Sequence, residues 1–289
     1  MVLKRFLTFT VFTVNLVLAG QSSAQLAMGN PAGVSMGHLH YFVDAPEDEK
    51  SFWLRLGASD MRLEGRVGVS FQGLIILIGE GDTQGGTEGS VVNHVAFRVR
   101  SLEELENKGF ELEYNQEFPG IASVYSPSDE RIELFDDSLA TNIGFDLEPG
   151  LIDQAANRHN QPLTADIVTH HLHFYLPPGQ AEMARNWYVE HFGASPGQRW
   201  RYAAADLPGM NLNFLEAEFA QAPTAGRTLN HIGFEIDGLE DFCEELETKG
   251  VVFETPYRIL DSGLGLAFLI DPWGTRIELT EGLSNLGQR

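Results

Sequence analysis

Histidines and glutamates recur twice along the chain in the same order, in a pattern typical of metal sites. Each falls in a separate apolar, strand-like segment, and residues on separate strands of a curved sheet can point into one concavity. Two imidazoles and one carboxylate suit a divalent ion that keeps open positions for a substrate. The same ligands serve Fe, Mn, Zn, Ni and Co, so they do not select the metal. The expected sets are His38, His94 and Glu133, and His171, His231 and Glu278.

The two sets lie in an internal repeat, which explains why the pattern occurs twice. The matched segments are 37–43 with 170–176, 93–97 with 230–234, and 131–134 with 276–279. Each copy predicts a strand, a helix and further strands, and then a second strand, helix and strands. The expected helices are 46–56 and 101–108 in the first copy, and 179–192 and 238–249 in the second. The fold class is therefore α+β, with two βαβββ modules in each copy.

The order of segments predicts four parts of the chain. Residues 1–24 have a basic start at Lys4 and Arg5, a short apolar run and small residues before position 25, as in a secretory signal peptide. Residues 25–137 and 168–289 are the two expected domains. Residues 138–167 have no clean periodicity and are expected to form a linker. The signal predicts a periplasmic or secreted protein without a membrane anchor.

Composition excludes several kinds of partner. The net charge of −22 becomes −24 when Lys4 and Arg5 are removed with the signal, and such an acidic surface repels nucleic acid and anionic membranes. The one cysteine, Cys243, lies in a helical pattern and is expected to pack in the core. We expect a small-molecule substrate, and a monomer or a homodimer.

The segment from Asp271 to Glu278 and the segment 230–234 resemble the vicinal-oxygen-chelate superfamily, which includes glyoxalase I, extradiol dioxygenases and bleomycin-binding proteins. The resemblance covers about 36–136 and 168–283. It implies tandem domains, each with βαβββ modules forming an open, incomplete β-barrel, and a metal in the cleft. It also implies that His171, His231 and Glu278 are ligands.

The chain departs from the best-known activities of this superfamily. Glyoxalase I-like sites use a further glutamate where the second copy has Asn213 and the first copy Ile75 or Ile76. The histidine and tyrosine that extradiol dioxygenases use before the final turn are absent from 264–270. Lyase and dioxygenase chemistry therefore both stay open.

Further side chains are candidates for acid–base or substrate-binding roles. His173 faces the same side of its strand as His171, and it is either a catalytic group or a partner in a cross-strand hydrogen bond. Tyr257 or its neighbour Arg258 is expected to face the cleft, and Arg201 or Trp200 alternates similarly on another strand. An arginine in the cleft would favour an anionic substrate.

The final turns favour the second copy as the working site. Asp271 and Gly274 are in the places usual for the superfamily, whereas the first copy has Ser126 and Asp129 there. The first-copy glutamate is therefore expected to be held less rigidly. On this interpretation His231→Ala abolishes activity, and His94→Ala leaves much of it.

The sequence leaves three functions to separate. The first is a divalent-metal-dependent enzyme acting on a small substrate with vicinal oxygens. The second is a non-catalytic periplasmic protein that binds a small molecule. The third is a structural or partner-binding protein that keeps only relics of the sites. Stoichiometric metal argues against the third, and turnover separates the first from the second.

Signal cleavage gives the first testable prediction. Because small residues precede Gln25, the exported protein should begin at or near that residue. N-terminal sequencing of protein recovered from a periplasmic fraction measures this directly. An intact Met1 on the exported protein would refute the prediction.

Overall fold

The structure is a computed structural model that describes residues 26–63, 66–137, 163–199 and 201–288. The predicted signal peptide lies outside the described residues, as do Trp200 and most of the predicted linker. None of the helices in the described ranges is both long enough and apolar enough to cross a membrane.

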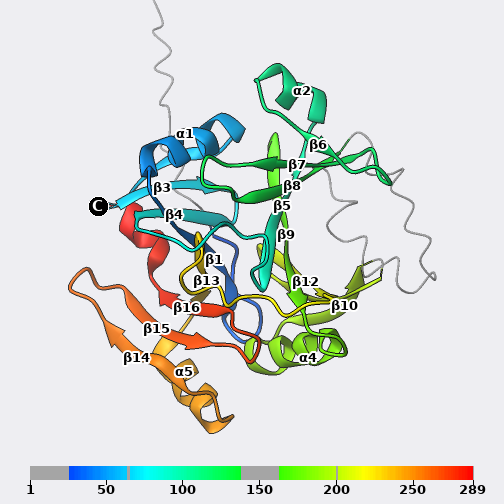
Figure 1. The fold of residues 1–289 in the computed structure, drawn as a ribbon. Helices are drawn as coiled ribbons and strands as arrows, with labels where there is room; N and C mark the ends of the chain where they lie inside the picture. Colours follow the sequence, from blue (N-terminus) through cyan, green and yellow to red (C-terminus); the bar gives the residue numbers. More distant parts are fainter. Residues whose placement is uncertain (1–25, 64–65, 138–162, 200, 289) are drawn as a thin grey trace, which may run out of the picture.

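Each copy folds as two βαβββ modules, as the sequence predicts (Figure 1). The first copy contains β1 (Val34–Val43), α1 (Pro46–Leu56), β2 (Ser59–Leu63), β3 (Arg66–Phe71) and β4 (Leu74–Glu80), then β5 (Val92–Val99), α2 (Leu102–Asn107), β6 (Glu113–Tyr114), β7 (Ile121–Tyr125) and β8 (Arg131–Asp136). The second contains β9 (Ile167–Leu176), α4 (Ala181–Phe192), β10 (Ser195–Arg199), β11 (Tyr202–Leu207) and β12 (Met210–Glu216), then β13 (Leu229–Ile236), α5 (Leu239–Thr248), β14 (Phe253–Ile259), β15 (Gly265–Ile270), β16 (Arg276–Glu281) and the short helix η2 (Leu283–Gln288).

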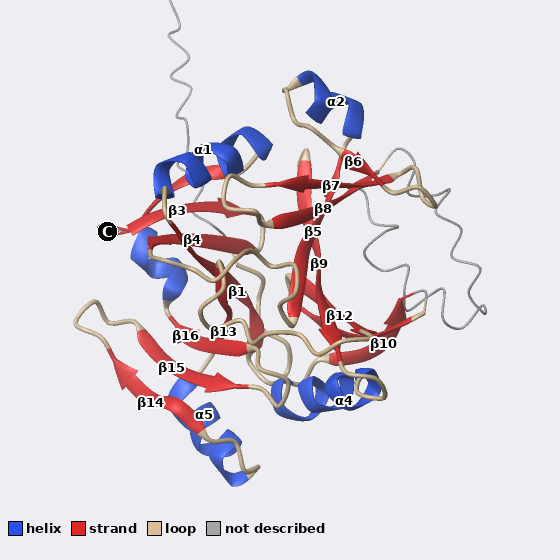
Figure 2. Ribbon diagram, viewed as in Figure 1, coloured by secondary structure: helices blue, strands red, loops and turns tan. Residues whose placement is uncertain are grey.

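The modules combine into two open sheets of eight strands. One sheet has the order β14-β15-β16-β13-β1-β4-β3-β2, and the other the order β10-β11-β12-β9-β5-β8-β7-β6. At the centre of each sheet two first strands of modules pair antiparallel, β1 with β13 and β5 with β9. Each of these strands also pairs in parallel with the last strand of its own module. Figure 2 shows the helices on the outside of these strands.

This pairing confirms the fold class and changes the expected grouping of the modules. The α+β class with pairs of βαβββ modules in open sheets is confirmed. Each sheet, however, takes one module from each copy: the outer two modules of the chain form one sheet, and the inner two form the other. The ranges 25–137 and 168–289 therefore describe the sequence repeat, and neither range forms a sheet alone.

Consecutive modules meet through aromatic side chains instead of through strand pairing. In the first copy, Trp53 of α1 and Phe71 of β3 contact Phe97 of β5, with ring centroids 6.1 and 4.6 Å apart. In the second copy, Phe192 of α4 contacts Phe234 of β13 at 4.9 Å. Trp53, Phe97, Phe192 and Phe234 are fully buried. Truncating such a side chain costs about 3–5 kcal/mol, so these contacts bind each copy firmly together.

The two final turns, 126–130 and 271–275, have the same backbone hydrogen bonds despite their different sequences. Asp129 has a φ of 59° where Gly274 has a φ of 100°. The Ser126 hydroxyl accepts a hydrogen bond from the Ser128 amide at 3.1 Å, as the Asp271 carboxylate accepts one from the Trp273 amide at 2.9 Å. Aspartate tolerates the left-handed region better than most residues, which permits the first turn. The structure therefore gives no sign of a looser first turn.

Buried groups join each turn to the helix of the preceding module. In the second copy, Tyr188 of α4 donates a hydrogen bond to Asp271 at 2.8 Å. In the first copy the acid is on the helix instead, and Ser126 donates to Glu49 of α1 at 2.9 Å. Glu49 also accepts a hydrogen bond from Trp53 Nε1 at 2.9 Å. Each turn is thus joined to its helix through one carboxylate. This carboxylate lies on the turn in the second copy and on the helix in the first copy.

A second carboxyl group beside the first turn makes stability depend on pH. Glu130 is buried, and burial raises its pKa to about 8, with a further contribution from the Glu49 carboxylate. The unfolded chain loses this proton near pH 4.5, so folding becomes less favourable as the pH rises from there to about 8. We predict that the effect of Glu130→Gln on the free energy of unfolding is more stabilising at pH 8.5 than at pH 5, by roughly 4 kcal/mol.

Urea unfolding at the two pH values measures this difference. Glu117→Gln, which changes an exposed carboxylate, is the matched control and should show the same small effect at both. A Glu130→Gln protein whose relative stability does not change with pH would contradict the assignment.

Candidate metal centres

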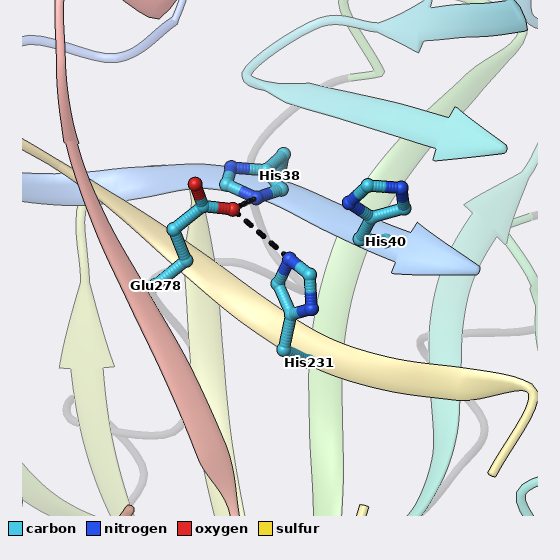
Figure 3. Close-up of side chains that lie close together, drawn as sticks. All are labelled: His38, His40, His231 and Glu278. Atoms are coloured by element: carbon cyan, nitrogen blue, oxygen red, sulfur yellow. Dashed lines mark hydrogen bonds and ion pairs between the residues drawn. The ribbon is translucent and has the colours of Figure 1, made fainter. Parts of the chain in front are cut away.

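The first cluster of metal-binding side chains lies where β1, β13 and β16 meet, and we call it the β1–β13 centre (Figure 3). It consists of His38, His40, His231 and Glu278, whose ligand atoms lie within 4.8 Å of one another. Nε2 of His38 and Nε2 of His231 each lie 2.9 Å from Oε2 of Glu278. Burial favours a raised pKa for Glu278, but the hydrogen bonds with the two histidines outweigh it and hold the pKa well below its ordinary range.

The second cluster, the β5–β9 centre, occupies the equivalent place in the other sheet. It consists of His94 on β5, His171 and His173 on β9, and Glu133 on β8. Nε2 of His94 and Nε2 of His171 lie 3.5 and 3.6 Å from Oε2 of Glu133. The ligand atoms of the three histidines lie within 4.8 Å of one another. Burial lowers the pKa of all three well below the ordinary value, so these imidazoles are neutral.

All six predicted ligands lie in these two centres, but the predicted grouping is wrong. His38 was expected with His94 and Glu133, and it lies instead with His231 and Glu278. His171 lies with His94 and Glu133. The cause is the pairing of strands across the copies, which brings the first-strand histidine of one copy to the histidine and glutamate of the other. An asymmetry between copies therefore cannot decide which centre works, and the expected contrast between His231→Ala and His94→Ala loses its basis.

The other predicted site residues lie in different parts of the fold. His173 lies in the β5–β9 centre. Tyr257 packs against the hydrophobic core, near Gly265 and Leu239, and is not among the residues gathered at either centre. Arg258 is exposed. Arg201 lies over the Tyr202 ring, which itself contacts His173 with ring centroids 4.6 Å apart.

An asparagine and an arginine orient one histidine of each centre, and the sequence reasoning missed them. Nδ1 of His94 lies 2.8 Å from Oδ1 of Asn93, to which Arg131 donates at 2.9 Å. The other centre has the same arrangement: Oδ1 of Asn230 lies 3.0 Å from Nδ1 of His231 and accepts a hydrogen bond from Arg276 at 3.0 Å. Because Oδ1 is an acceptor, it favours a proton on Nδ1, and at the β5–β9 centre this leaves Nε2 of His94 as the nitrogen that would bind a metal. The sequence contained a clue to this role, since the asparagine and the arginine both recur at matched places in the repeat.

The donor atoms of the β5–β9 centre fit a divalent metal ion. Nε2 of His94, Nε2 of His171 and Nε2 of His173 are buried and have no hydrogen-bond partner among the described residues. A buried polar atom without a partner costs about 1–3 kcal/mol, and here three converge beside one carboxylate. Neutral imidazole nitrogens and a carboxylate are the donors that first-row divalent metals prefer.

Comparisons with known proteins agree with this fold. Residues 170–279 match the family model of the Glyoxalase/Bleomycin resistance protein/Dioxygenase superfamily. Residues 170–279 belong to this superfamily. The superfamily predicted from the sequence motifs is thereby confirmed, although no curated protein matches the chain.

Solved structures show the same fold over most of the chain. A mutant glyoxalase I from Zea mays has a TM-score of 0.63 and 13% identity, and the match covers 88% of this chain and 96% of that one. A putative dioxygenase from Bacillus subtilis has a TM-score of 0.59 and 14% identity, and the match covers 92% of both chains. At these identities the likeness establishes the fold alone.

The residues beside the two centres differ. Beside the first-strand histidines, the register places Ile75 next to His38 but Asn211 next to His171. Beside the glutamates, it places Phe268 next to Glu278 but Ser123 next to Glu133. At these two positions the β1–β13 centre therefore has apolar neighbours, and the β5–β9 centre has polar ones.

Glu133 of the β5–β9 centre lines a cavity of about 330 Å³. Glu133, Arg131 and Tyr125 line it, together with Ser123. A volume of this size is at the lower end of the range for small-molecule sites. The metal-binding carboxylate is thus accessible to a small substrate.

Gly233 permits the close position of His38. A Cβ atom at Gly233 would overlap the His38 ring. The other centre has Ala96 at this place, next to His171 in the register, and there Nδ1 of His171 lies 2.7 Å from Nδ1 of His170. The different residues at this position account for the different positions of the two rings.

We predict that Gly233→Ala displaces His38 and weakens metal binding at the β1–β13 centre by about 10–100-fold, as displacement of a ligand does. Ala96→Gly is the matched change at the other centre and should leave metal binding there within a few-fold. Calorimetric titration of each metal-free variant measures both affinities. Two unchanged binding isotherms would show that the His38 ring is not held by contact with Gly233.

Proposed function

We propose that the protein is a divalent-metal-dependent enzyme of the glyoxalase and dioxygenase type, acting on a small substrate with vicinal oxygens at the β5–β9 centre. The observation that carries this proposal is the convergence of three buried Nε2 atoms beside Glu133, a residue that also lines an open polar cavity. The fold shared with glyoxalase I and a putative dioxygenase supports it.

The residues of this centre divide into those that hold the metal and those that face the substrate. His94, His171 and Glu133 would hold the ion, which when bound polarises substrate oxygens as a Lewis acid. Asn93 and Arg131 fix the ring of His94 through the hydrogen bonds described above. The hydroxyl groups of Ser123 and Tyr125, which line the cavity, can donate hydrogen bonds to the oxygens of a substrate.

The charges around the cavity limit the substrate. Arg131 lines the cavity, but Glu88 and Glu113 line it as well. One arginine among acidic groups favours a substrate with a single anionic or enolisable oxygen pair over a polyanion. The predicted signal peptide supports a location in the periplasm or outside the cell, where the chain would act as a monomer or a homodimer.

The function is tested by metal content and turnover together. Metal analysis should find about two ions in each chain, one for each centre. Catechols and α-hydroxycarbonyl adducts are then screened with Fe, Mn, Zn, Ni or Co added back. We predict that His94→Ala and Glu133→Gln each lose about one ion and at least about 100-fold in turnover.

The matched control is His231→Ala, which removes the equivalent histidine of the other centre. It should also lose one ion, but it should keep most of the turnover. If His231→Ala is inactive and His94→Ala is active, the working centre is the other one. Metal and ligand binding without any turnover would instead support the non-catalytic binding protein, and full metal content in both variants would refute both centres.

A further inference from the structure

A third histidine accompanies the predicted ligands in each centre. His40 follows His38 on β1 by two residues, and His173 follows His171 on β9 in the same way. Residues two apart on a strand face the same side of the sheet. The register places His40 next to His231 and His173 next to His94. The arrangement therefore occurs twice, at equivalent places.

The distances put these third histidines within reach of a shared ion. The ring of His173 lies 4.9 Å from that of His94 and 5.3 Å from that of His171, between centroids. Bonds of about 2.1 Å to one octahedral ion would place ligand atoms roughly 3–4.2 Å apart. The ligand atoms of the three histidines lie within 4.8 Å of one another, so a shift of less than about 1 Å brings them to these distances. The Glu133 carboxylate lies 3.5 and 3.6 Å from His94 and His171.

His173 also has the chemistry of a ligand. Its Nε2 is buried and has no hydrogen-bond partner among the described residues, as for the ring nitrogens of His94 and His171. A histidine kept only for packing or for a cross-strand hydrogen bond would not leave that nitrogen without a partner, because such an atom is costly to bury.

The strand register shows why a third histidine can take this role. Glyoxalase I-like sites use a further glutamate at about the place of Asn213, and this chain lacks it. Asn213 is the neighbour of His173 on the adjacent strand, as Leu77 is the neighbour of His40. The additional donor, His173, thus lies on β9, one strand away from the position on β12 where the resemblance to glyoxalase I-like sites implies a glutamate.

We propose that His173 and His40 are the fourth protein ligands of their centres, so that each ion is held by three imidazoles and one carboxylate. This inference rests on the proposed function and deepens it. A fourth protein ligand would leave fewer open positions on the bound ion than three ligands do. Such a centre would favour proton transfer on a chelated substrate, as in an isomerase or a lyase, over a reaction that must also bind O₂.

Cobalt binding tests the ligand role without any need for a substrate. Metal-free protein is titrated with Co²⁺, and both the affinity and the visible absorption of the bound ion are recorded. Wild type should show two sites. His173→Gln should weaken one site by at least about 10–100-fold and change its absorption, and His40→Gln should do the same to the other site. His191→Gln is the control, because His191 is buried in α4, stacked on Trp187 outside both centres.

A thiol variant keeps the test valid if a glutamine variant folds poorly. His173→Cys supplies another metal donor, and a thiolate bound to Co²⁺ gives an intense near-ultraviolet band. Burial raises the pKa of the native Cys243 to about 12, so the wild-type protein should not give this band. The band should appear in His173→Cys alone, and its absence from a folded, Co²⁺-loaded variant would overturn the proposal.

The remaining outcomes separate this inference from the proposed function. A wild-type protein that binds no Co²⁺ refutes both. A His173→Gln protein with wild-type affinity and absorption, but lower turnover, refutes the ligand role and makes His173 an acid–base group. Once a substrate is known, turnover should be the same under argon and in air. Stoichiometric consumption of O₂ would refute the assigned reaction class.

Discussion

The antiparallel pairing of β1 with β13, and of β5 with β9, is the contact on which the rest of the molecule depends. These strands carry the histidines, and their pairing brings ligands from both copies to one place. It requires the two modules of each copy to lie in different sheets. The aromatic contacts of Trp53 with Phe97, and of Phe192 with Phe234, then hold the two modules of a copy together.

The sequence predicted the local elements well because their signals are local. The helix expected at 46–56 matches α1, and the helix expected at 238–249 differs from α5 by one residue at each end. The six candidate ligands were identified because a short pattern occurred twice.

The pairing of the modules could not be obtained in this way. Every module has the same hydrophobic periodicity, so pairing within a copy and pairing across copies satisfy the pattern equally well. The residues that decide between them are the aromatic side chains between consecutive modules, and in the sequence Phe97 and Phe234 look like ordinary core residues. Asn93 and Arg131 were visible in the repeat, but their role became clear only from their contacts with His94.

The division of each copy between two sheets has a consequence for how the protein can evolve. Each centre takes its side chains from one module of each copy, and the two centres share no residue. A copy that lost all of its candidate ligands would therefore disrupt both centres. Neither copy alone can supply a complete centre. Selection on one centre acts on wall residues far apart in the chain, such as Ile75 with Phe268, or Asn211 with Ser123. In related chains these distant pairs should covary, whereas equivalent positions of the two copies are free to drift apart.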